Sequence, residues 1–145
     1  MISCDTNILF PACDSTSPNH TAARAFLSQY AEQDGFCLCE QVLMELYCLL
    51  RSPTVCKNPL SAKTAVEVVQ GFRSNPRWRV VDVVLGGEIM EHVWQQAGSQ
   101  GFAYCRTFDT RLGATLRHHG VTEFATCNAK DFADLGFDRV WNPLA

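Results

Sequence analysis

Four carboxylates in otherwise apolar stretches are the residues of this chain best suited to chemistry. Asp5 follows a short apolar run at the start of the chain, and Glu45 is the only residue of 42–50 that is neither apolar nor aromatic. Asp109 and Asp131 lie in the second half, each close to apolar segments. A carboxylate in low-dielectric surroundings needs a positive partner or takes up a proton. Four acids in such settings therefore predict a shared cation-binding site.

The chemistry of these ligands favours a hard divalent cation. Carboxylate oxygens without histidine suit Mg²⁺ or Mn²⁺. Such an ion can acidify a bound water and stabilise the charge that develops on a phosphodiester. The acids thus predict metal-dependent phosphodiester hydrolysis. Two alternatives remain open, because Asp5 could simply cap the helix that follows it and Glu45 could pair with an Arg or Lys from elsewhere.

Short apolar strands alternate with amphipathic helices along the chain, which is the pattern of a layered α/β fold. Strands are predicted at residues 1–4, 36–39, 78–81, 124–126 and around 140–141. Helices are predicted directly after Asp5 and at residues 20–33, 40–51, 61–72, 88–99 and 109–119. Right-handed crossovers then give one domain, residues 1–145, built as a three-layer α/β/α sandwich with a short, mostly parallel central sheet.

In such folds ligands bind beyond the carboxyl ends of the strands. Asp5 follows a strand, and Asp131 lies in a polar loop predicted at 127–132 after another strand. Asp109 opens one helix and Glu45 lies about one turn inside a second, so all four acids could reach this edge. The helix that carries Glu45 is apolar on nearly all sides, which predicts that it is buried.

Composition excludes several classes of protein. The chain has 145 residues and a net charge of −3, and no apolar run is long enough to cross a membrane. The N-terminus lacks the features of a secretory signal, so we expect a cytoplasmic protein. No Cys-x-x-Cys pair occurs, which favours buried free thiols over disulfides or a zinc site. The eight cysteines occupy positions 4, 13, 37, 39, 48, 56, 105 and 127.

Four short motifs resemble, in this order, the acidic motifs of the PIN-domain family. They are Asp5-Thr-Asn-Ile-Leu, Met44-Glu-Leu, Phe108-Asp-Thr-Arg-Leu-Gly-Ala-Thr-Leu and Asn128-Ala-Lys-Asp-Phe132. Over essentially its whole length the chain resembles VapC-type toxins of bacterial toxin–antitoxin pairs. The resemblance implies an α/β/α sandwich with Mg²⁺- or Mn²⁺-dependent endoribonuclease activity on RNA. It also implies a homodimer and a cognate antitoxin that blocks the acidic cleft.

Carried over by motif, the resemblance assigns a role to each acid. The catalytic acids would be Asp5, Glu45, Asp109 and Asp131. Three would bind metal directly, and Glu45 would do so directly or through water. Polar neighbours would orient carboxylates or waters, and these are Thr6, Asn7, Thr126 and Asn128. In the third motif Gly113-Ala114 stands where the family commonly has two alanines, a departure expected to affect helix packing more than chemistry.

Basic and aromatic residues near the motifs allow two interpretations. Four cations flank the acids in sequence and could form a rim for RNA phosphates, or could be ordinary solvated surface; they are Arg106, Arg111, Arg117 and Lys130. Trp94 is predicted on the inward face of its helix, as part of the core or a dimer surface.

Two functional alternatives also stay open: a housekeeping PIN nuclease that processes RNA, and a binding module without hydrolysis. The presence of all four acids argues against the second.

Overall fold

The computed structural model describes all 145 residues, which form five strands and seven helices. The strands are β1 Ile2–Cys4, β2 Phe36–Cys39, β3 Arg79–Val81, β4 Glu123–Ala125 and β5 Arg139–Trp141. The helices are α1 Thr6–Cys13, α2 His20–Tyr30, α3 Glu40–Arg51, α4 Ala62–Arg73, α5 Glu88–Ala97, α6 Arg106–His118 and α7 Ala129–Phe132. No helix has both the length and the apolar character needed to span a membrane.

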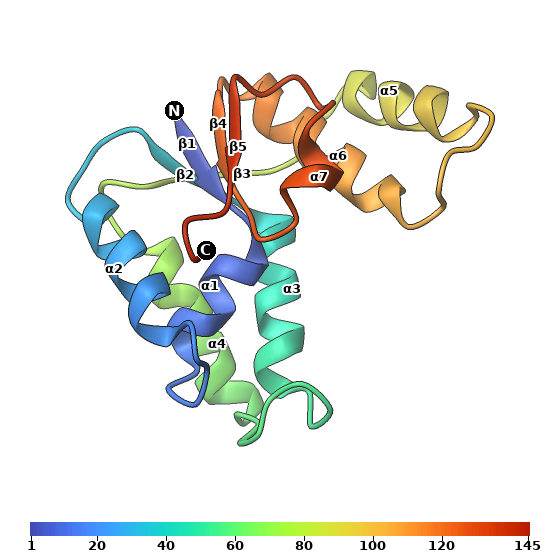
Figure 1. Ribbon diagram of the computed structural model, residues 1–145. Coiled ribbons are helices and arrows are strands. Elements are labelled where there is room, and N and C mark those ends of the chain that lie inside the picture. The colour runs from blue at the N-terminus through green and yellow to red at the C-terminus, as the bar shows by residue number, and fades with distance from the viewer.

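The strands form one sheet in the order β3-β2-β1-β4-β5, and every neighbouring pair is parallel. The chain steps outward from β1 to β3, returns to β4 on the other side of β1, and ends at β5. Because crossovers between parallel strands are right-handed, this reversal places α1–α4 and α5–α7 on opposite faces. Figure 1 shows α1–α4 gathered at the bottom of the view and α5–α7 at its upper right. The predicted three-layer sandwich is confirmed.

The reversal creates a topological switch point between β1 and β4, the place where such sheets bind ligands. Cys4 of β1 lies opposite Ala125 of β4 in the parallel register. The next residue, Asp5, donates its backbone N–H to the Ala125 carbonyl at 2.9 Å. Asp5 and Thr126 therefore leave the sheet side by side at its carboxyl edge.

The central strands are almost continuously apolar, as strands covered on both faces require. Every residue of β2 is fully buried, and so is Phe124 in β4. All eight cysteines are free thiols, as predicted, but only four of them are buried. Cys13 is half-buried and Cys48, Cys105 and Cys127 are exposed, so the expectation of buried thiols is wrong for these four.

Several local predictions need correction. α6 begins at Arg106, which places Asp109 in its first turn instead of at its start. The predicted polar loop around Asp131 contains the short helix α7. In α5 only Ile89 and Val93 are buried, whereas the Trp94 side chain is 61% exposed and does not point inward.

Gly113 of α6 lies against the Leu135 side chain, which follows α7. A Cβ atom at position 113 would come within 2.8 Å of Leu135 Cδ1 and 3.1 Å of its Cβ. The absence of a side chain lets the chain after α7 pack directly on α6. This contact supports the expectation that Gly113 affects helix packing.

Candidate active site

The first acid, Asp5, is the most firmly held of the four. It caps α1 through Oδ1, which accepts a hydrogen bond from the Thr6 backbone N–H at 2.7 Å. Its Oδ2 accepts from Asn7 Nδ2 at 2.8 Å and from Thr126 Oγ1 at 2.7 Å. The residue is only 9% exposed. Burial raises the pKa of Asp5, and the bonds from Thr126 and Thr6 act in the opposite direction.

Polar residues after β1 and β4 form one connected network beneath Asp5. Thr126 is fully buried, and its Oγ1 accepts from Asn7 Nδ2 at 3.1 Å and from the Asn128 backbone N–H at 3.0 Å. Asn7 Oδ1 in turn accepts from the Cys127 backbone N–H at 3.0 Å. Three of the four predicted orienting residues are therefore joined through Thr126. Asn128 takes part through its backbone.

Thr6, the fourth predicted orienting residue, links the first acid to the second. Its Oγ1 lies 2.9 Å from Glu45 Oε2 and 3.2 Å from the Val42 carbonyl, and it can donate to either. Glu45 is exposed and forms no ion pair. The prediction of a buried helix around Glu45 is wrong on this face, because Met44 is 68% exposed. The salt-bridge alternative for Glu45 is not observed either.

Asp109 is the acid whose pKa is raised by the charges of all three others. Its pKa is raised from 3.8 to about 6, first by burial and then by the negative charges of Asp131, Asp5 and Glu45. Arg106 opposes this shift. The charges of Asp131, Asp5 and Glu45 all act on Asp109, so the structure brings the four predicted acids into one region, as expected.

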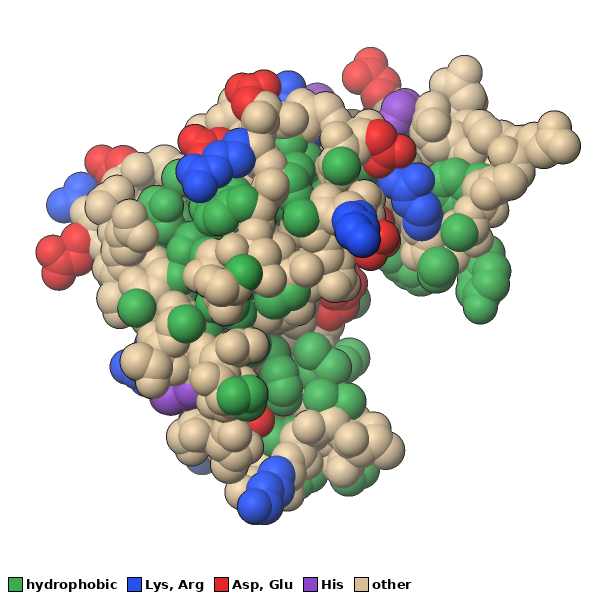
Figure 2. Space-filling view, viewed as in Figure 1, with side chains coloured by type: hydrophobic (Ala, Val, Ile, Leu, Met, Phe, Trp, Pro, Cys, Tyr) green, Lys and Arg blue, Asp and Glu red, His purple; other side chains and the backbone are tan.

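Three of the acids line a common cleft of about 420 Å³ at the carboxyl edge of the sheet. Its lining consists of Asp5, Thr6, Asn7, Phe10, Pro11, Glu45, Leu49, Asp109 and Asn128. Asp131 stands just outside, exposed in α7, and its carboxylate makes no hydrogen bond. A second, mainly apolar hollow of about 550 Å³ continues from this cleft between α3 and α6, sharing Glu45 and Leu49. Figure 2 shows hydrophobic side chains on both sides of this hollow and acidic side chains at its inner end.

Comparisons with known proteins agree with this arrangement. The profile of the PIN domain matches residues 2–138. Ribonuclease VapC24 of Mycobacterium tuberculosis is 49% identical over 144 residues, which cover 99% of this chain and 97% of the relative.

The chain belongs to the PIN-domain family.

Solved structures share the fold of this PIN domain at lower sequence identity. The crystal structure of Mycobacterium tuberculosis VapC20, a sarcin-ricin loop cleaving toxin, has a TM-score of 0.69 at 19% identity and covers 94% of this chain and 96% of its own. The DNA-bound VapBC structure from Salmonella typhimurium has a TM-score of 0.62 at 18% identity, covering 98% and 97%. Both likenesses extend over nearly the whole PIN domain.

The acids of this PIN domain fit a water-rich divalent ion better than a protein-enclosed one. No Lys or Arg side chain forms an ion pair with any of the four carboxylates, and only Arg106 acts on Asp109 from a distance. No three His, Cys, Asp or Glu side chains are close enough to enclose an ion by themselves. Mg²⁺ usually keeps several waters and uses one or two carboxylates. Asp5, Glu45, Asp109 and Asp131 are the residues that could hold it.

The predicted basic rim is largely occupied by internal contacts in this PIN domain. Arg106 Nη2 lies 2.7 Å from Asp134 Oδ1 and donates to the Asp131 carbonyl at 3.2 Å. Arg111 Nη1 donates to Gln41 Oε1 at 2.7 Å. Lys130 is exposed and has no ion pair. Arg117 Nη1 donates to the Val121 carbonyl at 2.7 Å. Among the four predicted cations, Lys130 is therefore the one whose charge is free to meet a phosphate.

Gln41 is the site residue that the sequence analysis missed. It lies in the first turn of α3 with 8% of its surface exposed, and its Nε2 faces Glu45 Oε1 at 3.4 Å. A polar residue four positions before an acid on a largely apolar helix is the signal that could have identified it.

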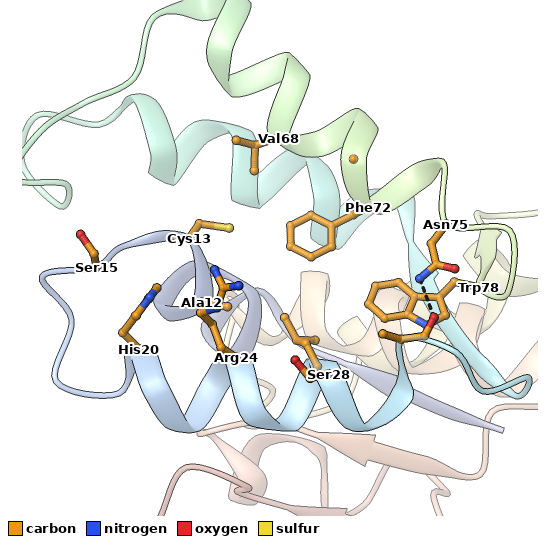
Figure 3. A pocket seen from close by; sticks show the side chains of 13 residues that line it. Ala12, Cys13, Ser15, His20, Arg24, Ser28, Val68, Phe72, Asn75 and Trp78 are labelled. Carbon is orange, nitrogen blue, oxygen red and sulfur yellow. Dashed lines mark hydrogen bonds between the residues drawn. The ribbon is translucent and has the colours of Figure 1, made fainter.

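A larger cavity of the PIN domain lies elsewhere, between α1, α2 and α4. It measures about 650 Å³ and has no acidic residue in its lining. Figure 3 shows Cys13 and Phe72 pointing into it, with Trp78 and Asn75 at one end and His20 at the other. Without a carboxylate it offers no ligands for the predicted metal chemistry. The smaller acidic cleft is therefore the candidate active site.

Proposed function

We propose that this PIN domain is a Mg²⁺- or Mn²⁺-dependent endoribonuclease and the toxin of a type II toxin–antitoxin pair. The observation that carries the proposal is that Asp5, Glu45, Asp109 and Asp131 lie in one region and none of them forms an ion pair with Lys or Arg. The 49% identity to a protein named as a VapC ribonuclease supports RNA as the substrate. The fold shared with a toxin that cleaves the sarcin-ricin loop points the same way.

The acids of the site differ in how firmly the rest of the chain holds them. Asp5, fixed by bonds from Thr6, Asn7 and Thr126, provides the stationary ligand. A bound Mg²⁺ or Mn²⁺ would lower the pKa of a coordinated water and neutralise charge on the phosphodiester. Before a cation binds, burial and the neighbouring acids raise the pKa of Asp109 to about 6, so its carboxylate carries the charge repulsion that a cation would relieve. Hydrolysis forms one P–O bond to the water oxygen and breaks one to a ribose oxygen, which leaves protonated.

Partners follow from the same proposal. The similar solved structures include VapBC from Salmonella typhimurium bound to DNA and VapBC2 from Rickettsia felis bound to a promoter fragment, which supports a cognate antitoxin for this chain. A homodimer is supported by large apolar side chains exposed on α3, on α5, in the turn before α6 and in the first turn of α6. They are Met44, Trp94, Tyr104 and Phe108. Met44 and Phe108 line the same hollow, and contiguous exposed apolar surface of this kind marks interaction sites.

The direct test is cleavage of an end-labelled structured RNA by the purified protein with Mg²⁺ or Mn²⁺. We expect internal cleavage that EDTA stops and that Asp5→Asn lowers by about 100-fold or more, because the substitution removes a ligand charge. Asp138→Asn, which changes an exposed aspartate before β5, is the matched control and should cleave like wild type. Equal activity in wild type and Asp5→Asn would refute the proposed site. An inactive wild type with every metal and RNA tried would refute the proposed function.

The alternative of a housekeeping RNA-processing nuclease makes a different prediction in the cell. A toxin arrests growth when expressed alone and is neutralised when the neighbouring small DNA-binding protein is co-expressed. A processing enzyme requires no such partner and does not arrest growth. Co-purification of that small protein with the chain would favour the toxin.

A further inference from the structure

We infer that Gln41 is a positioning residue of the acidic site, which orients Glu45 and ties it to the start of α6. The inference rests on the proposed function, because it concerns how the same acids are held. Gln41 precedes Glu45 by four residues, so both side chains lie on one face of α3. A primary amide that is only 8% exposed is costly to bury unless its polar atoms are bonded.

Each polar atom of the Gln41 side chain has a partner. Nε2 donates to the Phe108 carbonyl at 3.2 Å and faces Glu45 Oε1 at 3.4 Å. Oε1 accepts from Arg111 Nη1 at 2.7 Å. Phe108 is the residue directly before Asp109, so this bond fixes the backbone that carries the third acid. One amide therefore connects the second and third acids of the site.

Glu45 depends on this contact because little else holds it. It is exposed, and its only other hydrogen-bond donor is Thr6 Oγ1, at 2.9 Å from Oε2. An exposed glutamate side chain loses up to about 2 kcal/mol of rotamer entropy when it is ordered. Thr6 and Gln41 approach different oxygens of the carboxylate and together restrict its rotation. Gln41 thus lowers the cost of presenting Glu45 to a cation.

Arg111 extends the connection to the sheet. Its Nη1 donates to Gln41 Oε1, while its Nη2 lies 3.7 Å from Oδ1 of Asp82, the residue directly after β3. Arg111 is held from both sides, which fixes the orientation of the Gln41 amide with Oε1 toward the arginine and Nε2 toward the acids. A residue that only filled space at position 41 would need no such orientation, since Val42, Leu43 and Leu46 already bury apolar surface beside it.

Two substitutions separate positioning from packing. Gln41→Glu keeps the shape and the acceptor for Arg111 but replaces the Nε2 donor with an oxygen that repels Glu45 and the Phe108 carbonyl. Gln41→Met keeps the length and removes every polar atom. Gln95→Glu and Gln95→Met, on the exposed face of α5, are the matched controls. The readouts are kcat and KM for RNA, and the rise in melting temperature that Mn²⁺ alone produces.

We expect both Gln41 variants to lose about 10- to 100-fold in kcat, with KM for RNA within about 2-fold of wild type. The Mn²⁺-induced rise in melting temperature should shrink in both, and the Gln95 variants should match wild type. Wild-type kcat in either Gln41 variant overturns the inference, because catalysis would then not need the Gln41 amide. If neither variant folds, the residue serves the fold and not the site, and the inference is overturned as well. A wild type inactive on RNA refutes the proposed function instead, and the Mn²⁺ response of the Gln41 variants then decides the inference alone.

Discussion

Asp109→Asn is expected to stabilise the metal-free protein at neutral pH while it abolishes RNA cleavage. Asp109 lies in a partly buried position beside three other acids, and its pKa is raised from 3.8 to about 6. Between these two pH values the folded state binds more protons than the unfolded state. The free energy of unfolding therefore falls as the pH rises through this window, and the full penalty applies above pH 6. Asparagine has the same shape and carries no charge, so it escapes the penalty.

The magnitude follows from the shift of roughly two pH units. At about 1.4 kcal/mol per pKa unit, the free energy of unfolding would fall by about 3 kcal/mol if the whole pKa shift appeared as lost stability. Asp109 is partly exposed and screened by solvent, so we discount this figure to about 1 kcal/mol. For a chain of this size that corresponds to a rise in melting temperature of about 3–4 °C.

The assay is thermal unfolding of wild type, Asp109→Asn and the exposed control Asp138→Asn at a series of pH values, in buffer with EDTA. The advantage of Asp109→Asn should appear above pH 6 and vanish near pH 4, where wild-type Asp109 is protonated. Added Mn²⁺ should reverse the ranking, because only wild type keeps the full set of acids. A lower melting temperature for Asp109→Asn at pH 7.5 would show that attraction to Arg106 outweighs burial and repulsion, and would refute the reasoning.

Two further predictions concern the supports of the site. Thr126→Val removes the hydroxyl that bonds to Asp5 Oδ2; we expect a loss of about 1.5–3 kcal/mol in chemical denaturation and a 10- to 100-fold drop in RNA cleavage. Unchanged cleavage would contradict the orienting role. Gly113→Ala should destabilise by up to about 2 kcal/mol in the same assay, since overpacking against Leu135 exceeds the gain in helix propensity. Gly71→Ala in α4, where a Cβ meets nothing within 4 Å, should instead stabilise by about 0.5–1 kcal/mol, and equal effects at the two glycines would refute the packing argument.

The order of strands and helices could be predicted because each element carries its own periodic pattern. The run Phe36–Cys39 is too short for a helix and is apolar throughout, and it forms the buried strand β2. Ser61 offers a capping hydroxyl, which accepts from the Thr64 backbone N–H at 3.2 Å at the start of α4. The acids could be found because Asp5 directly follows a strand whose neighbours are parallel, which places it at the ligand-binding edge.

The environment of each acid could not be predicted, because an apolar pattern does not say what covers it. The helix around Glu45 is apolar on nearly all sides, yet the face that carries Met44, Glu45 and Cys48 is exposed next to a hollow. Gln41 could not be assigned a role because its partners, Phe108 and Arg111, lie 67 and 70 residues away in the sequence. Contacts at such separation arise only when the fold brings the start of α3 close to α6.

The two interpretations of Asp5, helix cap and metal ligand, are compatible once its acceptor positions are counted. An ionised carboxylate has about four lone-pair positions. One on Oδ1 accepts from the Thr6 backbone N–H, and both on Oδ2 accept from Asn7 and Thr126. One position on Oδ1 is left for an external partner. Asp131, in contrast, accepts no hydrogen bond through its carboxylate. Asp5 is therefore fixed before any cation arrives, whereas Asp131 is free to adjust its position. The capping bonds thus make Asp5 the most rigid ligand of the site.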